Sequence, residues 1–289
     1  MNPEVLIIGC GFLGKATADL FSAQGKSVLG VVRSASSCEK LRGNSFACFP
    51  CDVTDSVSVA ALASRLKGVP LAIYAVSSGR GGADEYASVY RDGLRRILES
   101  WQPQKILFIS STSVYGQNDG SRVTEDSPTL PDRETGKILL EAEQIALKAG
   151  GIVARFSGIY GPDRSVLLRK FLAGEAVLEE GGHRIVNQIH RDDGASALLR
   201  LASRSLPSGI FNVTDNTPAT QREVYGWMSE FLKRPMPPEG SANPNRKRGI
   251  TSKRISNAKL RSLGWAPIFP SYRDALPQLV NTSDQEQPE

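Results

Sequence analysis

Short apolar runs alternate with amphipathic stretches through the first half of the chain. Six apolar runs bounded by turn residues have the length and composition of buried strands, and they cover residues 4–9, 27–32, 46–53, 70–77, 105–111 and 151–161. Between them, apolar positions recur at helical spacing over residues 14–25, 83–101 and 136–150. Strand, helix and strand in repeated order predict an α/β fold with a Rossmann-type, doubly wound parallel sheet.

The pattern changes after Tyr160, where the elements become shorter and glycine and proline more frequent. The apolar run 210–215 indicates one more strand that returns to the main sheet, so the small C-terminal substrate lobe is expected to be discontinuous. The expected bounds are 1–156 with 187–217 for the dinucleotide-binding domain, 157–186 and 218–280 for the substrate lobe, and 281–289 for a polar, frayed tail.

Length and composition are those of an ordinary globular protein. The chain has 289 residues, of which 40% are hydrophobic and 22% charged, so it can bury a core without disulfides or metals. No apolar run reaches the roughly 18 residues that cross a bilayer, and the N-terminus lacks the pattern of a signal peptide. We therefore expect a cytoplasmic protein with no membrane partner.

The net charge of +5 is a mild basic excess that favours an anionic ligand as readily as a nucleic acid. The densest basic cluster precedes the last helix and contains Arg246, Lys247, Arg248, Lys253 and Arg254. A nucleic-acid surface would carry interleaved aromatic residues or a recognised binding module, and neither is present. The cluster is therefore either a solvated loop or a source of one arginine, Arg248, for an anionic small-molecule substrate.

All four cysteines lie within the first 51 residues. Cys48 and Cys51 form a CxxC pair, but zinc would need more ligands, and a redox CxxC normally begins a helix rather than following a strand pattern. We expect buried thiols here. The chain has only two histidines, so no metal site is expected.

Gly9, Gly11 and Gly14 form GxGxxG between the first strand and the first helix. The first glycine permits a tight turn, the second lets a pyrophosphate approach the backbone, and the third allows the helix to pack closely on the strand. The helix N-terminus at Phe12 and Leu13 then offers N–H groups and a partial positive charge to phosphates. The alternative is a turn that needs glycine only for packing.

The end of the second strand discriminates between NAD and NADP, because a carboxylate there binds the ribose 2′-hydroxyl and repels a 2′-phosphate. Residues 31–37 contain no acid, and Arg33 is followed by Ser34, Ser36 and Ser37. These groups suit a phosphate, so we predict NADP, with NAD as the second choice. The alternative is that Arg33 is a solvated surface charge.

Two other strand ends supply candidate ligand contacts. Asp52 and Val53 close the third strand and are expected to flank the adenine, although Asp52 is equally suited to cap the helix that follows. At the end of the fourth strand, Ala75 and Val76 are assigned to the cofactor and Ser77 to the substrate. The carboxyl ends of parallel strands face the ligand crevice in sheets of this kind.

The fifth strand ends in the hydroxyl-rich sequence FISSTSVYG (108–116), and five further motifs surround it: GCGFLG (9–14), RFSGIYGPDR (155–164), IHRDD (189–193), FNVTDNTP (211–218) and KLRSLGWAP (259–267). With these motifs in this order, the chain resembles the extended short-chain dehydrogenases/reductases of the NAD-dependent epimerase/dehydratase family. The resemblance covers most of the chain and implies a hydroxyl, tyrosine and lysine set beside the nicotinamide.

Aligning these motifs places the family's catalytic groups on particular residues. Ser111, with Thr112 adjacent, takes the hydroxyl position and would bind the reacting oxygen, unless these hydroxyls only cap a turn. Lys137 takes the lysine position and would hold the ribose. The tyrosine's position is occupied by Arg133, which can orient an anion or polarise a carbonyl but cannot release a proton.

Three substitutes for the missing tyrosine stay open. Tyr115 or Tyr160 supplies a phenol, Glu134 acts as acid or base, or the protein performs no redox chemistry. The departure resembles an atypical subgroup of extended members that lacks this tyrosine. Arg133, Tyr160 and Arg164 are the expected substrate contacts, together with those named above.

We therefore predict an NADP-preferring oxidoreductase, epimerase or dehydratase that acts on a hydroxyl-bearing, anionic substrate such as a nucleotide sugar. The alternative is a non-catalytic NADP(H)-binding redox sensor that signals to a protein partner, which Arg133 favours. Nucleic-acid binding would instead show a steep salt dependence. Amphipathic helices over 85–101 and 137–148 could pair across a two-fold axis, which leaves a homodimer open.

Overall fold

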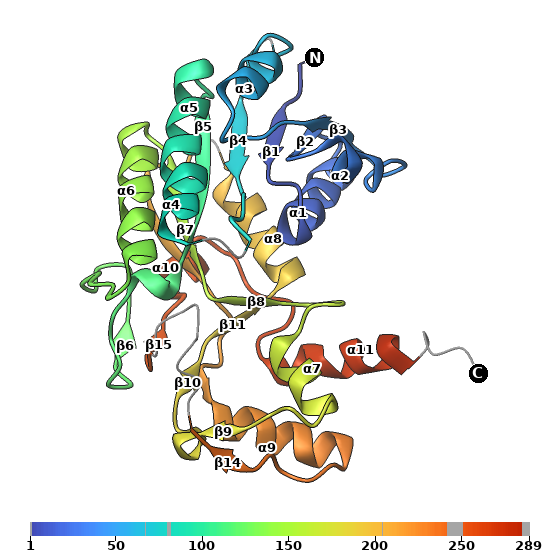
Figure 1. Cartoon of the computed structure of the whole chain (residues 1–289), viewed down its shortest axis with the longest axis vertical. Helices are drawn as coiled ribbons and strands as arrows, with labels where there is room; N and C mark the ends of the chain where they lie inside the picture. The colour runs from blue at the N-terminus through green and yellow to red at the C-terminus, as the bar shows by residue number, and fades with distance from the viewer. Residues whose placement is uncertain (1, 67, 80–81, 204, 242–250, 285–289) are drawn as a thin grey trace. The chain divides into compact units, whose positions relative to one another are not determined.

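The described part of the chain covers residues 2–66, 68–79, 82–203, 205–241 and 251–284 of a computed structural model (Figure 1). It contains a seven-stranded sheet with the spatial order β12 (Gly209–Val213), β7 (Ile152–Phe156), β5 (Lys105–Ser111), β4 (Leu71–Tyr74), β1 (Val5–Ile8), β2 (Val28–Val32) and β3 (Ala47–Pro50). The four neighbouring pairs from β3 to β5 are parallel. The predicted α/β fold is confirmed, and the run 210–215 forms the edge strand β12 as expected.

The central strands are buried along their whole length. Every residue of β1 and of β4 is buried, because helices such as α1 (Phe12–Ala23) and α6 (Glu134–Lys148) cover the two faces of the sheet (Figure 1). This burial explains why the sequence shows continuous apolar runs rather than alternation. The strand order reverses between β1 and β4, and sheets of this type bind ligands at that point, beyond the carboxyl ends of the strands.

The chain forms two compact units. Unit 1 contains residues 1–114, 131–155 and 195–211, and unit 2 contains residues 115–130, 156–194 and 212–289. The remaining helices of unit 1 are α2 (Ala35–Glu39), α3 (Ser56–Ala63), α4 (Ala83–Tyr86), η1 (Ala87–Asp92), α5 (Gly93–Ser100) and the 3₁₀ turn η2 (Thr112–Val114). Helix α8 (Arg191–Leu201) begins in unit 2 and continues into unit 1.

Unit 2 has an apolar core of its own, to which Tyr160, Phe171, Tyr225, Met228 and Tyr272 contribute. Its helical elements are α7 (Val166–Leu172), η3 (Glu180–Gly182), α9 (Gln221–Leu232), α10 (Ala258–Arg261) and α11 (Tyr272–Asp284). Its short strands are β6 (Arg122–Val123), β8 (Gly158–Tyr160), β9 (Leu178–Glu179), β10 (Ile185–Val186), β11 (Gln188–His190), β13 (Ala219–Thr220), β14 (Glu239–Gly240) and β15 (Arg254–Ile255). All of these strands form two-stranded pairs, namely β6 with β15, β8 with β11, β9 with β14 and β10 with β13.

The expectation of one strand over residues 151–161 is wrong. The chain changes hydrogen-bond partners at Ser157, whose N–H donates to Val213 O, whereas the N–H of Gly158 donates to Asn187 O. The first half is therefore β7 of the main sheet, and the second half is β8, which pairs in parallel with β11. An apolar run alone does not reveal such a change of partner.

The C-terminal end of the described chain is helical. Helix α11 extends to Asp284 and includes the first residues of the polar tail expected at 281–289, while 285–289 lie outside the described residues. Among the residues that are described, no helix has the length and apolar character needed to span a membrane.

Residues 83–101 form one helical stretch whose middle is widened into the π-helical η1. Tyr74 Oη donates a hydrogen bond of 2.5 Å to the carbonyl oxygen of Val89, and a Cβ added at Gly93 would lie 2.5 Å from that Oη. The phenol therefore takes the place of a helical N–H donor, and glycine at position 93 leaves room for it.

A buried polar network joins α6 to two strands of unit 1. Arg155 on β7 donates from Nε to Glu143 Oε1 (3.0 Å) and from Nη2 to Oε2 (2.6 Å), and Ser110 Oγ on β5 donates to Oε1 (2.5 Å). The side chains of Arg155 and Glu143 are only 3% and 1% exposed. Because Glu143 bonds both strands, the network fixes α6 against the carboxyl end of β5.

We expect Glu143→Gln to lower the free energy of unfolding by roughly 3 kcal/mol, because it leaves the buried Arg155 guanidinium without its counter-charge. Urea unfolding followed by circular dichroism would measure the change. Glu99→Gln, at an exposed position on α5, is the matched control and should stay within about 0.5 kcal/mol of the unchanged protein. Equal stability of the two variants would show that the network is not needed for folding.

Candidate cofactor and catalytic site

The turn from β1 into α1 is closed by direct contact between backbones. Gly9 has φ +94°, and a Cβ added to it would lie 2.5 Å from the carbonyl group of Ala75 at the end of β4. A Cβ added to Gly14 would lie 2.4 Å from the carbonyl oxygen of Gly9. These two glycines therefore let the β1–α1 turn pack against β4 and let α1 pack against the turn.

Gly11 differs from its neighbours because a Cβ there would meet nothing within 4 Å. Packing within the chain does not require glycine at this position, and the space lies at the N-terminus of α1. No side chain caps this helix and its first turn carries no acid, so its N–H groups and partial positive charge are available to an anion. This arrangement fits the pyrophosphate of a dinucleotide.

Other predicted cofactor contacts lie at neighbouring strand ends of unit 1. Ala75 N donates to Ile8 O (2.7 Å), which fixes the end of β4 beside the turn, and Val76 follows half-buried. Asp52 Oδ1 accepts from the N–H and the hydroxyl of Thr54, so it forms a turn rather than a helix cap.

The cap of α3 is Asp55, whose carboxylate accepts from the N–H groups of Val57 and Ser58. Val53 is buried. An adenine role for Asp52 and Val53 stays a prediction.

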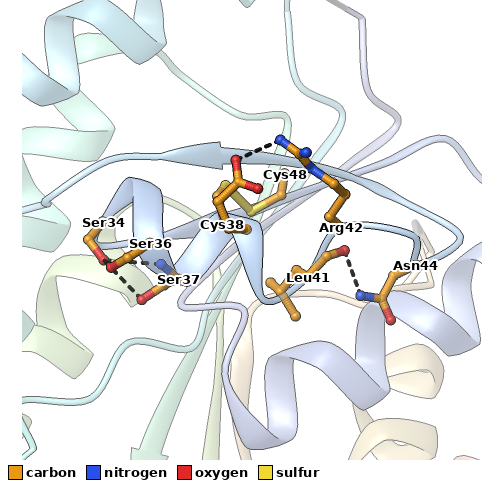
Figure 2. Close-up of a disulfide and its surroundings, with 9 residues drawn as sticks. Ser34, Ser36, Ser37, Cys38, Leu41, Arg42, Asn44 and Cys48 are labelled. Atoms are coloured by element: carbon orange, nitrogen blue, oxygen red, sulfur yellow. Dashed lines mark hydrogen bonds and ion pairs between the residues drawn. A yellow bond between two sulfur atoms is a disulfide. The ribbon is translucent and has the colours of Figure 1, made fainter.

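The residues after β2 form an exposed group of donors. Arg33 is exposed, and Ser34 caps α2 by accepting from Ser37 N. Ser34 Oγ also lies 3.0 Å from both Ser36 Oγ and Ser37 Oγ (Figure 2). We call Ser34, Ser36 and Ser37 the serine cluster. An arginine beside three hydroxyls matches the donors that a phosphate requires.

The expectation of four buried thiols is wrong for two of the cysteines. Cys38 on α2 and Cys48 on β3 form a disulfide, with their Cα atoms 5.7 Å apart, on the same short helix as the serine cluster (Figure 2). Cys48 and Cys51 therefore do not act together as a CxxC pair, because Cys48 is bonded to Cys38. Cys10 and Cys51 are buried free thiols, and burial raises the pKa of Cys10 to about 12. Among the described residues, no group of histidine, cysteine and carboxylate side chains is placed to hold a metal ion.

The catalytic candidates of unit 1 lie at the end of β5 and the start of α6. Ser111 is half-buried and its Oγ accepts from Ser113 N (3.2 Å), and Thr112 is 9% exposed. On α6, the exposed Lys137 Nζ lies 3.2 Å from Glu134 Oε2. Arg133 is exposed at the N-cap of the same helix. Nothing in these contacts gives Arg133 the ability to release a proton.

Three of the other candidates belong to unit 2. Tyr115 is fully buried and its hydroxyl donates to Asn212 Oδ1 (2.9 Å), so proton transfer by this phenol would require that bond to break. Tyr160 is 2% exposed, and burial raises its pKa. Arg164 is exposed. Arg248 lies outside the described residues.

A phenol that the sequence reasoning missed lies at the strand ends of unit 1. Tyr74, the last residue of β4, and Phe108 of β5 are register partners, so Ser77 follows the end of the strand that neighbours the one carrying Ser111. Tyr90, on η1, is half-buried and close enough to the hydroxyl of Ser77 for hydrogen bonding. Its phenol is therefore near the edge that carries Ser111.

Burial raises the pKa of the Tyr90 phenol, while hydrogen bonds to Ser77 and Ser78 act in the opposite direction. Tyr90 lies on the π-helical η1, and such turns are frequent at functional sites. A glycine at position 93 inside a helical pattern was the available signal. It marks a local distortion but does not identify the side chain that benefits.

Sequence comparison identifies relatives along most of the chain. A family model described as the NAD dependent epimerase/dehydratase family matches residues 5–214. Protein YeeZ of Escherichia coli (strain K12) is 28% identical over 240 residues, which cover 79% of this chain and 84% of YeeZ. The 3-diazoavenalumate denitrifying reductase of a Streptomyces species is 30% identical over 175 residues, which cover 53% of this chain and 57% of the reductase.

Solved structures are similar over nearly the whole chain. A candidate NAD-dependent epimerase/dehydratase from Methylobacillus flagellatus has a TM-score of 0.79 and 29% identity, with 98% of this chain and 99% of that chain covered. MoeE5 in complex with UDP-glucuronic acid and NAD has a TM-score of 0.82 and 22% identity, with 98% and 100% covered. At 22% identity, the similarity to MoeE5 shows a shared fold.

We expect Gly11→Ala to weaken NADPH binding and Gly9→Ala to lower the stability of the fold. Gly11→Ala should change the free energy of unfolding by at most about 1 kcal/mol, the cost of a poorer helix cap, while NADPH affinity falls at least about tenfold because the Cβ occupies the pyrophosphate space. Gly9→Ala should cost roughly 2 kcal/mol or more through overpacking and backbone strain. Urea unfolding and NADPH fluorescence titration measure both. Unchanged NADPH binding by Gly11→Ala would place the pyrophosphate elsewhere.

Proposed function

Since the chain belongs to the NAD dependent epimerase/dehydratase family, we propose that it is a cytoplasmic enzyme that binds NADP(H) in unit 1 and acts on a hydroxyl-bearing small molecule. The observation that carries the proposal is the open space at Gly11 above the uncapped N-terminus of α1. When bound there, the nicotinamide would supply or accept a hydride. The chain's own residues then hold the dinucleotide and manage the proton.

The preference for NADP over NAD rests on Arg33 and the serine cluster. Residues 31–37 carry no carboxylate to bind a 2′-hydroxyl, and the hydroxyls of the serine cluster lie 3.0 Å apart beside the exposed arginine. A 2′-phosphate would gain a charge-assisted hydrogen bond from Arg33 and neutral ones from the hydroxyls. NAD is the second choice, because the family is described by that cofactor.

Tyr90 is our candidate for the proton donor. Burial raises the pKa of its phenol, so the phenol is protonated at neutral pH and suited to donate to a carbonyl oxygen whose carbon is being reduced. Ser111, at the end of β5, would donate a second hydrogen bond to the same oxygen. Tyr115 is less suited, because its buried hydroxyl already donates to Asn212.

Lys137 and Arg133 complete the proposed set. Lys137, exposed on α6 and paired with Glu134, would release that pair to hold the ribose. Arg133 keeps its charge at every accessible pH, so it would orient an anionic group of the substrate. Of the residues assigned to unit 2, Tyr160 and Arg164 are proposed to contact the substrate.

The proposed substrate class is a nucleotide sugar. MoeE5, which shares the fold, is described in complex with UDP-glucuronic acid and NAD. The Streptomyces relative is described as a reductase, which agrees with a protonated phenol that favours the direction of reduction. These likenesses support the class and leave the identity of the sugar to experiment.

A non-catalytic redox sensor is the second candidate. Arg133 at the family's tyrosine position favours it, because arginine cannot exchange a proton. A sensor would bind NADPH as the enzyme does, but it would not oxidise it with any substrate. The enzyme and the sensor therefore differ in whether Tyr90 donates a proton to a substrate.

We expect Arg33→Ala to weaken NADPH binding by about 10- to 100-fold, the equivalent of one charge-assisted hydrogen bond, and to leave NADH binding within about twofold. Fluorescence titration with both nucleotides measures this. Arg42→Ala removes another exposed arginine, one that pairs with Glu39, and should change neither affinity. Equal loss for both nucleotides would remove Arg33 from the 2′-phosphate site, and no binding by the unchanged protein would reject both the enzyme and the sensor.

We expect Tyr90→Phe to lower kcat/KM for NADPH-dependent reduction by about 10²- to 10⁴-fold, the usual contribution of a positioned acid. NADPH affinity should stay within about twofold, because only the hydroxyl is lost. Tyr86→Phe is the control, since its ring lies 4.9 Å from that of Tyr90. Steady-state rates with a panel of nucleotide sugars and carbonyl compounds measure the effect. A Tyr90→Phe enzyme as active as the unchanged one would exclude this phenol as the donor.

A further inference from the structure

Unit 2 contains a cavity of about 300 Å³ whose lining shares no residue with the proposed cofactor and substrate site. Its polar lining comes from three arginines and three other side chains: Arg122, Arg254, Arg261, Asp215, Asn216 and Asn257. Its residues belong to segments that are far apart in the sequence but lie within the same unit. Cavities of this volume are at the lower end of those that bind small molecules.

Two of the arginines are held side by side by strand pairing. Arg122 of β6 and Arg254 of β15 are register partners in a parallel pair, so both side chains leave the pair on the same face. Like charges directly opposite each other are unfavourable in a sheet. Arg261, at the end of α10, lines the same cavity and adds a third positive charge.

The three guanidinium groups lie outside the ion pairs of the described residues, although Arg254 interacts electrostatically with Glu223. None of them forms an ion pair with a carboxylate there, and the hydrogen bonds of the first two go to neutral acceptors. Arg122 Nη2 donates to Ser256 Oγ (3.1 Å), and Arg254 Nη1 donates to Gly120 O (2.5 Å). These bonds hold the two side chains in place and leave other N–H groups of each guanidinium available for a ligand.

The rest of the cavity is already ordered. Asn257 is 7% exposed and its Nδ2 donates to Thr214 O (2.9 Å), Asp215 O (3.2 Å) and Asn216 Oδ1 (2.8 Å). An ordered pocket lowers the entropic cost of binding.

Asp215 is the one acidic side chain in the lining, and it is 2% exposed. Its Oδ1 accepts from Thr217 N, and its Oδ2 has no hydrogen-bond partner among the described atoms. Burial raises the pKa of this carboxyl. The direction of this shift favours the neutral form of the carboxyl, which carries no charge to offset the arginines.

We propose that this arginine pocket, formed by Arg122, Arg254 and Arg261, binds a phosphate- or diphosphate-bearing small molecule. Guanidinium groups pair with phosphate oxygens in a planar, bidentate geometry that a monovalent anion does not match. The diphosphate of a nucleotide-linked substrate and a free phosphorylated metabolite share this chemistry. The proposal does not depend on the cofactor assignment, because the pocket's residues are all different from those assigned to the dinucleotide.

The test is isothermal titration of the full chain with sodium pyrophosphate, inorganic phosphate and UDP. The test variant is Arg122→Gln/Arg254→Gln, and the control is Arg169→Gln/Lys170→Gln, which removes the same charge from α7 of the same unit. We expect pyrophosphate binding that weakens at least about tenfold in the test variant, as for the loss of charge-assisted bonds, and by less than about twofold in the control. Binding should also weaken as salt is raised.

Two further variants keep the result interpretable. Gly11→Ala, which blocks the dinucleotide turn, should retain pyrophosphate binding, whereas the test variant should retain NADPH binding. If the double variant does not fold, Arg261→Gln replaces it, since Arg261 is exposed at the end of a short helix. It should weaken binding by about threefold or more, in line with one lost charge contact.

UDP binding that is at least about tenfold tighter than pyrophosphate binding supports a nucleotide-linked source, and equal affinities support a free phosphorylated metabolite. No detectable binding at 10 mM, the highest concentration to be titrated, overturns the proposal. Binding that survives the arginine substitutions but is lost in Gly11→Ala also overturns it, because pyrophosphate would then occupy the dinucleotide turn.

Discussion

The contact between the backbones of Gly9, Gly14 and Ala75 is the constraint on which the rest of unit 1 depends. A Cβ on Gly9 or Gly14 would lie within 2.5 Å of backbone atoms, a distance that forces a strand or helix to move. Because β4 lies between β1 and β5, a displaced β4 would also shift the strand ends that carry Ser77 and Ser111. The packing of the sheet and the placement of the candidate site residues therefore share one requirement.

Polar side chains determine the remaining geometry of this edge. Glu143 bonds Arg155 and Ser110, which fixes the helix carrying Lys137 against the strand carrying Ser111. On β4 itself, Tyr74 bonds Val89 in the widened helix that carries Tyr90, and this helix packs against α6. Each of these bonds is buried, where a hydrogen bond that is lost is not replaced by water. These bonds therefore hold the elements that carry Ser111, Lys137 and Tyr90 in a defined arrangement.

The sequence predicted what local pattern controls. The buried strands are visible as apolar runs because both faces of the sheet are covered. The glycine-rich turn is visible because Gly9, Gly11 and Gly14 lie close together in the sequence. The break at Ser157, the Cys38–Cys48 bond and the direction of Tyr90 could not be predicted, since each depends on a partner that only the tertiary fold brings near. The pairing of Arg122 with Arg254 is the extreme case, because two-residue strands carry almost no periodic signal.

That same strand pair has a consequence for synthesis on the ribosome. Arg122 precedes its hydrogen-bond partner Ser256 by 134 residues, which at ~5–20 residues per second corresponds to roughly 7 to 27 seconds of translation. Residues of unit 1 end at 211, whereas unit 2 needs segments up to its C-terminal helix. The nascent chain can therefore complete unit 1 before β15 has been synthesised and can pair with β6.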